Sequence, residues 1–251
     1  MENCQKMHKF INEATHIDIR GQSQMPEVHL KKLVAETAVN EYVEDGMIVG
    51  LGTGSTAYYA IKRVGELVAD GYNLTCVATS VQSETLAREC GINVVDIDEV
   101  DHIDVTIDGA DEVDDGMQLI KGLGGALLRE KIVAAASLKE VIVVDGSKKV
   151  DILGMKTPLP VEVLKFGCQK TKYALEKQGC KANLRMTGGT PFITDSGNYI
   201  YDCKFESISN PFFLESRIDV IPGVVENGLF LNTATTVLIA SGNGEIERLG
   251  E

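Results

Sequence analysis

Short apolar runs alternate with amphipathic segments over residues 30–145, and this alternation limits the possible folds more than any other feature of the sequence. The runs MIVGLG, LTCVATS, INVVDI, DVTID and EVIVVDG have the character of buried strands. The segments LKKLVAETAVNEYV, AYYAIKRVGELVADG, SETLAREC and GALLREKIVAAASL resemble helices. The pattern predicts an α/β fold with a mainly parallel sheet and helices on both faces. Ligands of such sheets bind beyond the carboxyl ends of the strands.

The pattern changes near residue 154. MKTPLPVEVL reads as a strand, FGCQKTKYALEKQG as a helix, ANLRM as a strand, FITDSGNYIYDCKF as two strands joined by a turn, and NPFFLESRIDVIPGV as a helix. This order predicts a smaller ferredoxin-like α+β domain over residues 154–225, inserted between residues 27–153 and 226–251 of the main domain. Within the second part, LFLNTATTVLIAS is expected to rejoin the first sheet. Residues 1–26 show no sustained period and are expected to form a loose extension or an oligomer contact.

Composition narrows the classes of partner. The chain has 251 residues, 44% of them hydrophobic, which is enough for a substantial core. Its 37 acidic and 24 basic residues give a net charge of −13, which disfavours nucleic acid and anionic membranes as partners. Because no stretch is apolar enough to span a bilayer and the first residues contain no signal-peptide core, a cytoplasmic location is expected. A small anionic substrate would therefore need a local pocket of amides and cations.

The six cysteines are scattered without a Cys-x-x-Cys spacing, and the four histidines form no cluster in the sequence. This pattern indicates neither a zinc site nor a redox-active cysteine pair. We expect reduced, mostly buried thiols and no bound metal.

The segment GLGTGST at residues 50–56 joins a predicted strand to a predicted helix. Small residues let backbone N–H groups approach an anion, the helix contributes the positive end of its dipole, and Ser55 and Thr56 add hydroxyl donors. The segment therefore fits a phosphate-binding loop. A plain tight turn explains the same residues equally well, and the spacing matches no nucleotide-binding motif.

Acidic residues gather directly after a predicted strand, where six of the residues at 104–115 are Asp or Glu. Asp108 falls where the strand ends, and a Gly-Ala turn lets Asp111 point back towards it. Two carboxylates at a strand terminus are candidates for moving hydroxyl protons. Glu112, Asp114 and Asp115 are expected to be solvated loop charges.

Glu130 and Lys121 are the other candidates for catalysis. On a helix through residues 126–138, Glu130 has apolar neighbours at steps of three and four, so its carboxylate is desolvated, its pKa rises and it becomes a better base. An exposed first-turn glutamate favoured by the helix dipole is an equally good interpretation of this helix alone. Lys121 precedes a glycine-rich segment and could place its ammonium near a developing oxyanion.

Taken together, several separated motifs resemble the type A ribose-5-phosphate isomerases. They are GLGTGST, ATSVQSE, TIDGADEVD, the glycine cluster followed by ALLREKIVA, VDGSKKVDILG, LPVEV, TDSGNYIYDC and GVVENGLF, which together extend from about residue 32 to 244. The resemblance implies a Rossmann-like domain with a small α+β insert, a homodimer or homotetramer, and no metal or organic cofactor. It also implies an aldose–ketose isomerisation of D-ribose 5-phosphate to D-ribulose 5-phosphate through an enediolate, in the non-oxidative pentose phosphate pathway.

The resemblance assigns roles to individual residues. It implies that Glu130 is the base that moves a proton between C2 and C1, that Asp108 assists ring opening and hydroxyl proton transfer, that Asp111 positions the sugar and that Lys121 stabilises the enediolate. The implied substrate-binding residues are Lys32, Thr53, Gly54, Ser55, Thr56, Gly109, Gly122, Gly124 and Lys148, together with Asp108, Asp111 and Lys121.

Two features depart from the family pattern. Leu123 interrupts the glycine run that usually follows the lysine, and a branched side chain there could crowd the sugar. The N-terminal 25 or so residues are additional.

Two other functions share this kind of scaffold. A non-catalytic sugar-phosphate sensor would keep the phosphate loop and lose the base, and an amino-sugar phosphate deaminase would need a histidine beside these motifs. Asp108, Lys121 and Glu130 together favour the isomerase over both.

Overall fold

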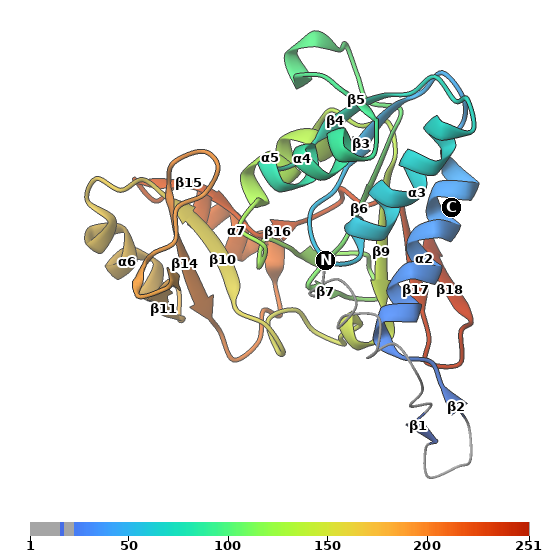
Figure 1. Ribbon diagram of the computed structural model, residues 1–251. Helices are drawn as coiled ribbons and strands as arrows, with labels where there is room; N and C mark the ends of the chain where they lie inside the picture. Colours follow the sequence, from blue (N-terminus) through green and yellow to red (C-terminus); the bar gives the residue numbers. More distant parts are fainter. Residues whose placement is uncertain (1–15, 18–22, 251) are drawn as a thin grey trace.

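The computed structural model describes residues 16–17 and 23–250 (Figure 1). Within these residues the largest sheet has seven strands in the order β18-β17-β9-β6-β3-β4-β5. Every neighbouring pair is parallel except the edge pair β17–β18. The strands are β3 (Ile48–Leu51), β4 (Thr75–Ala78), β5 (Asn93–Val94), β6 (Val105–Asp108), β9 (Glu140–Asp145), β17 (Thr236–Ala240) and β18 (Ile246–Gly250).

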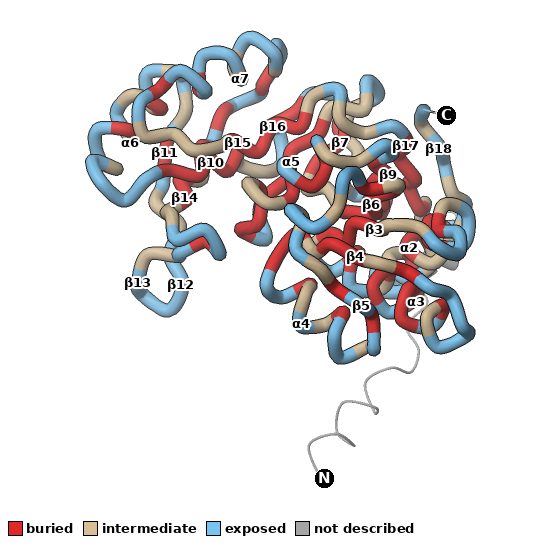
Figure 2. The backbone as a smooth tube through the Cα atoms, turned by 90° about the horizontal axis from the view of Figure 1, so that it is seen from above, coloured by how far each residue is buried: buried red, intermediate tan, exposed pale blue. Residues whose placement is uncertain are grey.

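Helices cover both faces of this sheet. On one face α2 (Glu27–Tyr42), α3 (Ala57–Ala69) and α4 (Val81–Glu89) bury apolar side chains against residues such as Val49, Val105 and Val141. On the other face α5 (Leu127–Ala135) packs Leu127 against Ile142. Because the central strands β3, β6 and β9 are buried on both faces, most of their residues are apolar, and Figure 2 shows the buried colour along them. The predicted α/β class with a mainly parallel sheet is confirmed.

A second unit follows β9 in the chain and stands beside the main sheet (Figure 1). Its strands form an antiparallel sheet in the order β11-β14-β10-β15. Its elements are β10 (Leu159–Val163), α6 (Cys168–Glu176), β11 (Lys181–Leu184), β14 (Tyr199–Lys204), α7 (Pro211–Asp219) and β15 (Val224–Asn227). The order β-α-β-β-α-β with these strand neighbours is ferredoxin-like, as predicted, and its apolar core also takes in Ile120 and Leu229 of the adjoining small sheet.

Shorter elements complete the described chain. A small sheet in the order β16-β8-β7 lies between the two units and contains β7 (Glu112–Val113), β8 (Leu119–Ile120) and β16 (Leu229–Phe230). Two-residue strands form the hairpins β1 (His16–Ile17) with β2 (Ser23–Gln24), and β12 (Met186–Thr187) with β13 (Thr190–Pro191). Single turns of 3-10 helix occur at η1 (Ile97–Glu99) and η2 (Gly146–Lys148).

The structure corrects some of the predicted boundaries. The first of the two strands predicted in FITDSGNYIYDCKF is absent from the structure, since β13 ends at Pro191 and the next strand, β14, begins at Tyr199. Helix α2 begins at Glu27, before the expected Leu30. The sequence pattern placed the start too late because the first turn is exposed and so lacks apolar residues at helical spacing. The tail divides into β16 and β17, and only β17 joins the main sheet. Most of the predicted N-terminal extension, residues 1–15 and 18–22, lies outside the described residues.

The expectation that Glu112 is a solvated loop charge is wrong. Its side chain is fully buried, and its carboxylate accepts hydrogen bonds from the backbone N–H groups of Gly154, Lys156 and Thr157 at 2.6–2.8 Å. A buried carboxylate is tolerated when several donors satisfy it. Glu112 therefore fastens the segment that enters the second unit.

Among the helices of the described residues, none combines the length and the apolar character that a bilayer span requires.

Candidate active site

The predicted phosphate loop lies between β3 and α3, at the carboxyl end of the sheet. Gly52 is required there, because a Cβ at this position would lie 2.2 Å from Asp108 Oδ1. Gly54 has φ +116°, a backbone conformation that side-chain-bearing residues rarely adopt. The two glycines thus bring the loop against the end of β6 and turn it into the helix.

The loop offers free donors to a ligand. The N–H groups of Ser55 and Thr56, at the start of α3, donate to no acceptor within the described residues, and both residues line the same cavity as Lys148. Free N–H groups at a helix N-terminus bind phosphate well. Thr53 behaves differently, since its N–H donates to Asp108 Oδ1 at 3.0 Å and its hydroxyl bonds with Thr79 and Ser80. Thr53 therefore shapes the loop, while its neighbours remain available to a ligand.

Asp108, Lys121 and Glu130 form a buried cluster, of which Lys121 and Glu130 line this cavity and Asp108 lies behind Lys121. Lys121 Nζ lies 2.9 Å from Asp108 Oδ2 and 3.5 Å from Glu130 Oε2, and it also donates to the carbonyl oxygen of Gly109. The three side chains are at most 4% exposed. Lys121 is supported from below by the ring of Phe230, whose centroid is 5.3 Å from Nζ. Side chains from the end of β6, the segment after β8 and helix α5 therefore meet at one point.

The prediction that Glu130 is desolvated is confirmed, and the alternative of an exposed first-turn glutamate is wrong. Glu130 occupies the first turn of α5 with the buried side chains of Leu127, Val133 and Ala134 on the same face. Burial raises the pKa of Glu130 to about 8, against the opposing attraction of Lys121, while Asp108 and Asp111 raise it further. A carboxyl group that titrates near neutral pH is well suited to general base catalysis.

Burial alone would lower the pKa of Lys121, but the surrounding carboxylates of Asp108, Glu130 and Glu140 more than offset this, and the pKa lies above its ordinary value. Lys121 therefore stays a cation. A fixed cation in a water-poor site is worth far more to a developing oxyanion than one in solvent.

Asp111 lies at the rim of the cavity and orders the glycine segment after Lys121. Its Oδ2 accepts a hydrogen bond from the N–H of Leu123 at 2.9 Å. Burial raises its pKa, and this hydrogen bond with the nearby charges of Lys121, Lys148 and Arg185 opposes the rise. The predicted loop residues Gly109, Gly122 and Gly124 line the same cavity.

Leu123 has an ordinary negative φ, is 38% exposed and is not among the residues that line the cavity. Its backbone helps to hold the loop in place, because the carbonyl oxygens of Leu123 and Gly122 both accept hydrogen bonds from Arg185 Nη1 at 3.0 Å. Arg185 belongs to the second unit, where it is paired with Asp202. No motif in the sequence pointed to Arg185, which directly follows strand β11.

Of the two outlying lysines predicted to bind substrate, one lines the cavity and the other does not. Lys148 ends η2 and lines the cavity, whereas Lys32 lies on α2 with its ammonium 3.6 Å from Glu36 and is not among the lining residues. The structure thus brings together all of the predicted site residues except Lys32.

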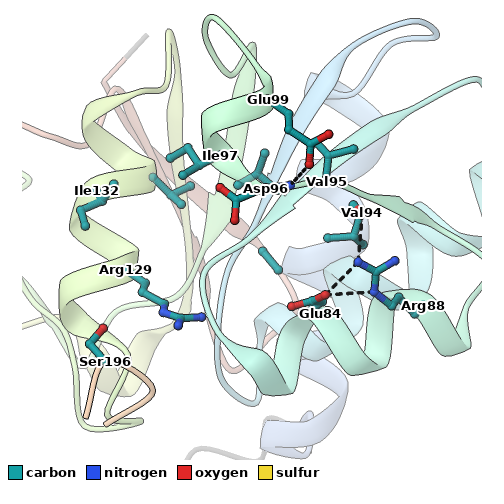
Figure 3. Close-up of a pocket in the computed structure, with 13 residues that line it drawn as sticks. Glu84, Arg88, Val94, Val95, Asp96, Ile97, Glu99, Arg129, Ile132 and Ser196 are labelled. Atoms are coloured by element: carbon teal, nitrogen blue, oxygen red, sulfur yellow. Dashed lines mark hydrogen bonds and ion pairs between the residues drawn. The ribbon is translucent and has the colours of Figure 1, made fainter. Parts of the chain in front are cut away.

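A larger cavity of about 520 Å³ lies on the outer side of α5, between α4 and α5 (Figure 3). Arg129 and Ile132 of α5 face Glu84 and Arg88 of α4 across it, and Glu84 is paired with Arg88 at 2.8 Å. None of the Asp108–Lys121–Glu130 cluster lines this cavity. Lys121 and the desolvated Glu130 line the smaller cavity instead.

Within the described residues, no group of three or more His, Cys, Asp and Glu side chains is arranged to hold a metal ion. What the smaller cavity combines is a base with a raised pKa, a permanent cation and free amide donors. Such a set can bind a phosphate, remove a proton from carbon and stabilise the resulting oxyanion.

Comparison with known proteins gives consistent matches. The family model for ribose 5-phosphate isomerase A (phosphoriboisomerase A) matches residues 75–244. The ribose-5-phosphate isomerase A of Gloeobacter violaceus is 52% identical over 216 residues, which cover 86% of this chain and 94% of that protein. The ribose-5-phosphate isomerase A of Sphingopyxis alaskensis is 48% identical over 222 residues, which cover 88% and 96%.

Solved structures agree with the sequences. The ribose 5-phosphate isomerase of Plasmodium falciparum is 41% identical with a TM-score of 0.87, covering 89% of this chain and 99% of that one. A D-ribose-5-phosphate isomerase in complex with phospho-erythronic acid has the same identity and TM-score, with coverage of 90% and 100%.

Proposed function

This chain belongs to the ribose 5-phosphate isomerase A family, and we propose that its Asp108–Lys121–Glu130 cluster interconverts D-ribose 5-phosphate and D-ribulose 5-phosphate. The reaction is an aldose–ketose isomerisation in the non-oxidative branch of the pentose phosphate pathway. One solved relative is complexed with phospho-erythronic acid, a phosphorylated sugar acid. An anion of this kind suits a cavity that offers amides at one end and an ammonium at the other.

The proton moves on Glu130. The ionised carboxylate removes the proton from C2 of the open-chain aldose, which leaves an enediolate, and returns a proton to C1 to give the ketose. The rise in its pKa on burial makes the carboxylate a stronger base than an exposed glutamate.

Lys121 and Asp108 act on the oxygens. The Lys121 ammonium is held in place by Asp108 and by the Gly109 carbonyl, so it needs little reorganisation as negative charge develops on the enediolate. Asp108 opens the ring and moves hydroxyl protons, and Asp111 positions the sugar at the rim of the cavity.

The phosphate binds at the other end. The free N–H groups of Ser55 and Thr56 receive it at the start of α3, and Lys148, which lines the same cavity, adds a positive charge. Lys32 is retained as a substrate contact on the family resemblance alone.

The rival functions lack support from the site. A sensor has no need for a base, yet Glu130 lies buried 3.5 Å from Lys121. A deaminase needs a histidine, and none of the described residues that line the cavity is one.

One observation carries the proposal, namely the desolvated Glu130 beside a permanently charged Lys121. The test is to incubate the purified chain with ribose 5-phosphate in buffer containing EDTA and to measure ribulose 5-phosphate. Since Lys121 supplies the positive charge, we expect activity without added metal. Absence of product in buffers from acid to alkaline pH would refute the function.

Three further proposals accompany this one. Residues 27–153 with 226–251 form the catalytic domain and residues 154–225 the small domain, a division supported by the separate main sheets of the two parts. The chain assembles as a homodimer or homotetramer, as the resemblance implies, and light scattering would test it. The protein resides in the cytoplasm, which cell fractionation would test.

A further inference from the structure

Glu140 is a buried glutamate that the mechanism above does not use. It is the first residue of β9, where it pairs with Thr106 of the parallel strand β6. Partners in register point to the same face of a sheet, and so do residues two apart along a strand. Glu140 therefore shares a face with Asp108, and this is the face that α5 covers through the contact of Ile142 with Leu127.

The carboxyl group of Glu140 has nothing to satisfy a charge. Its side chain is 2% exposed, and neither oxygen accepts a hydrogen bond from any described residue. The titratable groups that face it are Asp108 on β6, Lys121 after β8 and Glu130 on α5. An ionised carboxylate in such surroundings is strongly disfavoured.

The count of charged groups around Glu140 also disfavours its ionised form. Lys121 is the one cation of the described chain that acts on this group, and it already lies 2.9 Å from Asp108 and 3.5 Å from Glu130. One ammonium cannot neutralise three buried carboxylates. The uncharged acid is the form of Glu140 that leaves the Lys121 charge available to substrate.

We propose that Glu140 is a positioning residue that must stay protonated while the enzyme works, and that its ionisation at high pH inactivates the site by engaging the Lys121 ammonium. This inference rests on the proposed isomerase function. Burial, followed by the negative charge of Asp108, raises the pKa of Glu140 well above its ordinary value, although Lys121 opposes the rise. Glu130 lies 3.5 Å from the Lys121 ammonium, a contact that favours its ionised form and that Glu140 lacks, so Glu130 is the first of the two to ionise.

The test compares the pH dependence of kcat in the wild type and in Glu140→Gln, a neutral side chain of the same shape. Because Glu140 gives up its proton as the pH rises and its carboxylate then engages Lys121, we expect kcat of the wild type to fall on the alkaline side. In Glu140→Gln the fall should move up by roughly one pH unit or more, or vanish, while kcat at pH 8 stays within about threefold of the wild type. Loss of the Lys121 proton does not explain the fall, since the pKa of Lys121 is also raised.

Glu162→Gln is the matched control. Glu162 is likewise buried with a raised pKa, but it accepts hydrogen bonds from Thr194 and Asn198 in the second unit and does not act on the cluster. Its alkaline limb should coincide with that of the wild type.

Thermal unfolding supplies a readout that does not depend on turnover. A carboxyl with a raised pKa in the folded state stabilises the fold fully below its unfolded pKa, and this stabilisation is lost as the pH rises through the folded pKa. The difference in Tm between Glu140→Gln and the wild type should therefore grow in favour of the variant from about pH 5 to pH 8. A merely structural role would give a constant difference in Tm and an unchanged alkaline limb.

Each possible result either supports or overturns the proposed role of Glu140. An active wild type whose alkaline limb coincides with that of Glu140→Gln would overturn the proposal, as would a constant difference in Tm. If Glu140→Gln does not fold, Glu140→Met, which also cannot ionise, takes its place. Failure of both to fold would overturn it too, because a site built for an uncharged acid should accept an uncharged side chain of that length. An inactive wild type would instead refute the isomerase function, and the Tm comparison would still judge Glu140.

Discussion

The ammonium of Lys121 and the carboxylate of Asp108 are 2.9 Å apart, and water reaches almost none of either side chain. Removing one member of such a pair leaves the other buried without its partner, which is strongly destabilising. Asp108 also receives the N–H groups of Thr53 and Gly109, so the pair connects the phosphate loop to the lysine. The Asp108 carboxylate thus pairs with the lysine and also holds the phosphate loop in shape.

Lys121→Met should lower kcat by roughly 10²- to 10³-fold, because the enediolate loses its cation. It should also lower the free energy of unfolding by about 3 kcal/mol through the unpaired Asp108. Steady-state kinetics and denaturant unfolding would measure the two effects. Lys131→Met is the control, since Lys131 also lies over the Phe230 ring but pairs with Glu226 outside the cavity. Equal kinetic losses in both variants would contradict the role of Lys121.

Glu130→Gln keeps the shape of the side chain and removes the proton acceptor. We expect kcat to fall by roughly 10²-fold or more with little change in substrate binding. Exchange of the C2 proton with solvent deuterium should stop as well. Glu84→Gln, at another first-turn glutamate but on α4, should retain full turnover. If Glu130→Gln turned over normally, the base would have to be a different group.

The pH dependence of kcat/KM on the acid side should follow Glu130. Its pKa is raised from 4.5 to about 8, so the base is ionised only as the pH approaches that value, and kcat/KM should rise up to it. The same shift has a consequence for stability. The stabilisation from this carboxyl is complete below its unfolded pKa and is lost as the pH rises through about 8. A profile already flat at pH 6 would show that the base titrates normally.

Recognition of the phosphate should be separable from the chemistry. Thr56→Ala removes one hydroxyl from the cavity wall at the start of α3, and it should raise KM more than it lowers kcat. Free ribose should be a very poor substrate, because the binding energy of the phosphate is lost. Thr85→Ala on α4, whose hydroxyl only donates to the Val81 carbonyl, is the matched control. Equal efficiency on ribose and ribose 5-phosphate would refute the phosphate site.

Leu123→Gly tests the departure from the family's glycine run. Because Leu123 has an ordinary φ and does not line the cavity, the variant should keep its activity and lose about 1 kcal/mol of stability through added chain entropy and lost burial. Kinetics with ribose 5-phosphate and thermal unfolding would measure both. A clear gain in kcat/KM would mean that the leucine crowds the sugar.

Sequence reasoning located Asp108 and Glu130 because each stands at a position with a readable signal, a strand terminus in one case and an apolar helix face in the other. Arg185 and Glu112 carry no such signal. Their roles come from partners far away in the chain, the carbonyls of Gly122 and Leu123 for Arg185 and the N–H groups near residue 156 for Glu112. Local pattern cannot reveal contacts that only the packing of the units creates.

Strand β18 shows a different limit. It is an edge strand whose residues are exposed or only half-buried, so it lacks the apolar run by which the central strands were identified.

The contacts that hold Lys121 in place come from residues that are synthesised much later than the lysine itself. The N–H of Lys121 donates to the carbonyl oxygen of Gly228 at 2.9 Å, and the ring beneath its ammonium belongs to Phe230. Domains tend to fold while the chain is being synthesised, N-terminal part first. On the ribosome the lysine emerges long before these two supports, so the nascent polypeptide carries every reacting group and still has no working centre. Fragments released early by interrupted translation would therefore be catalytically silent.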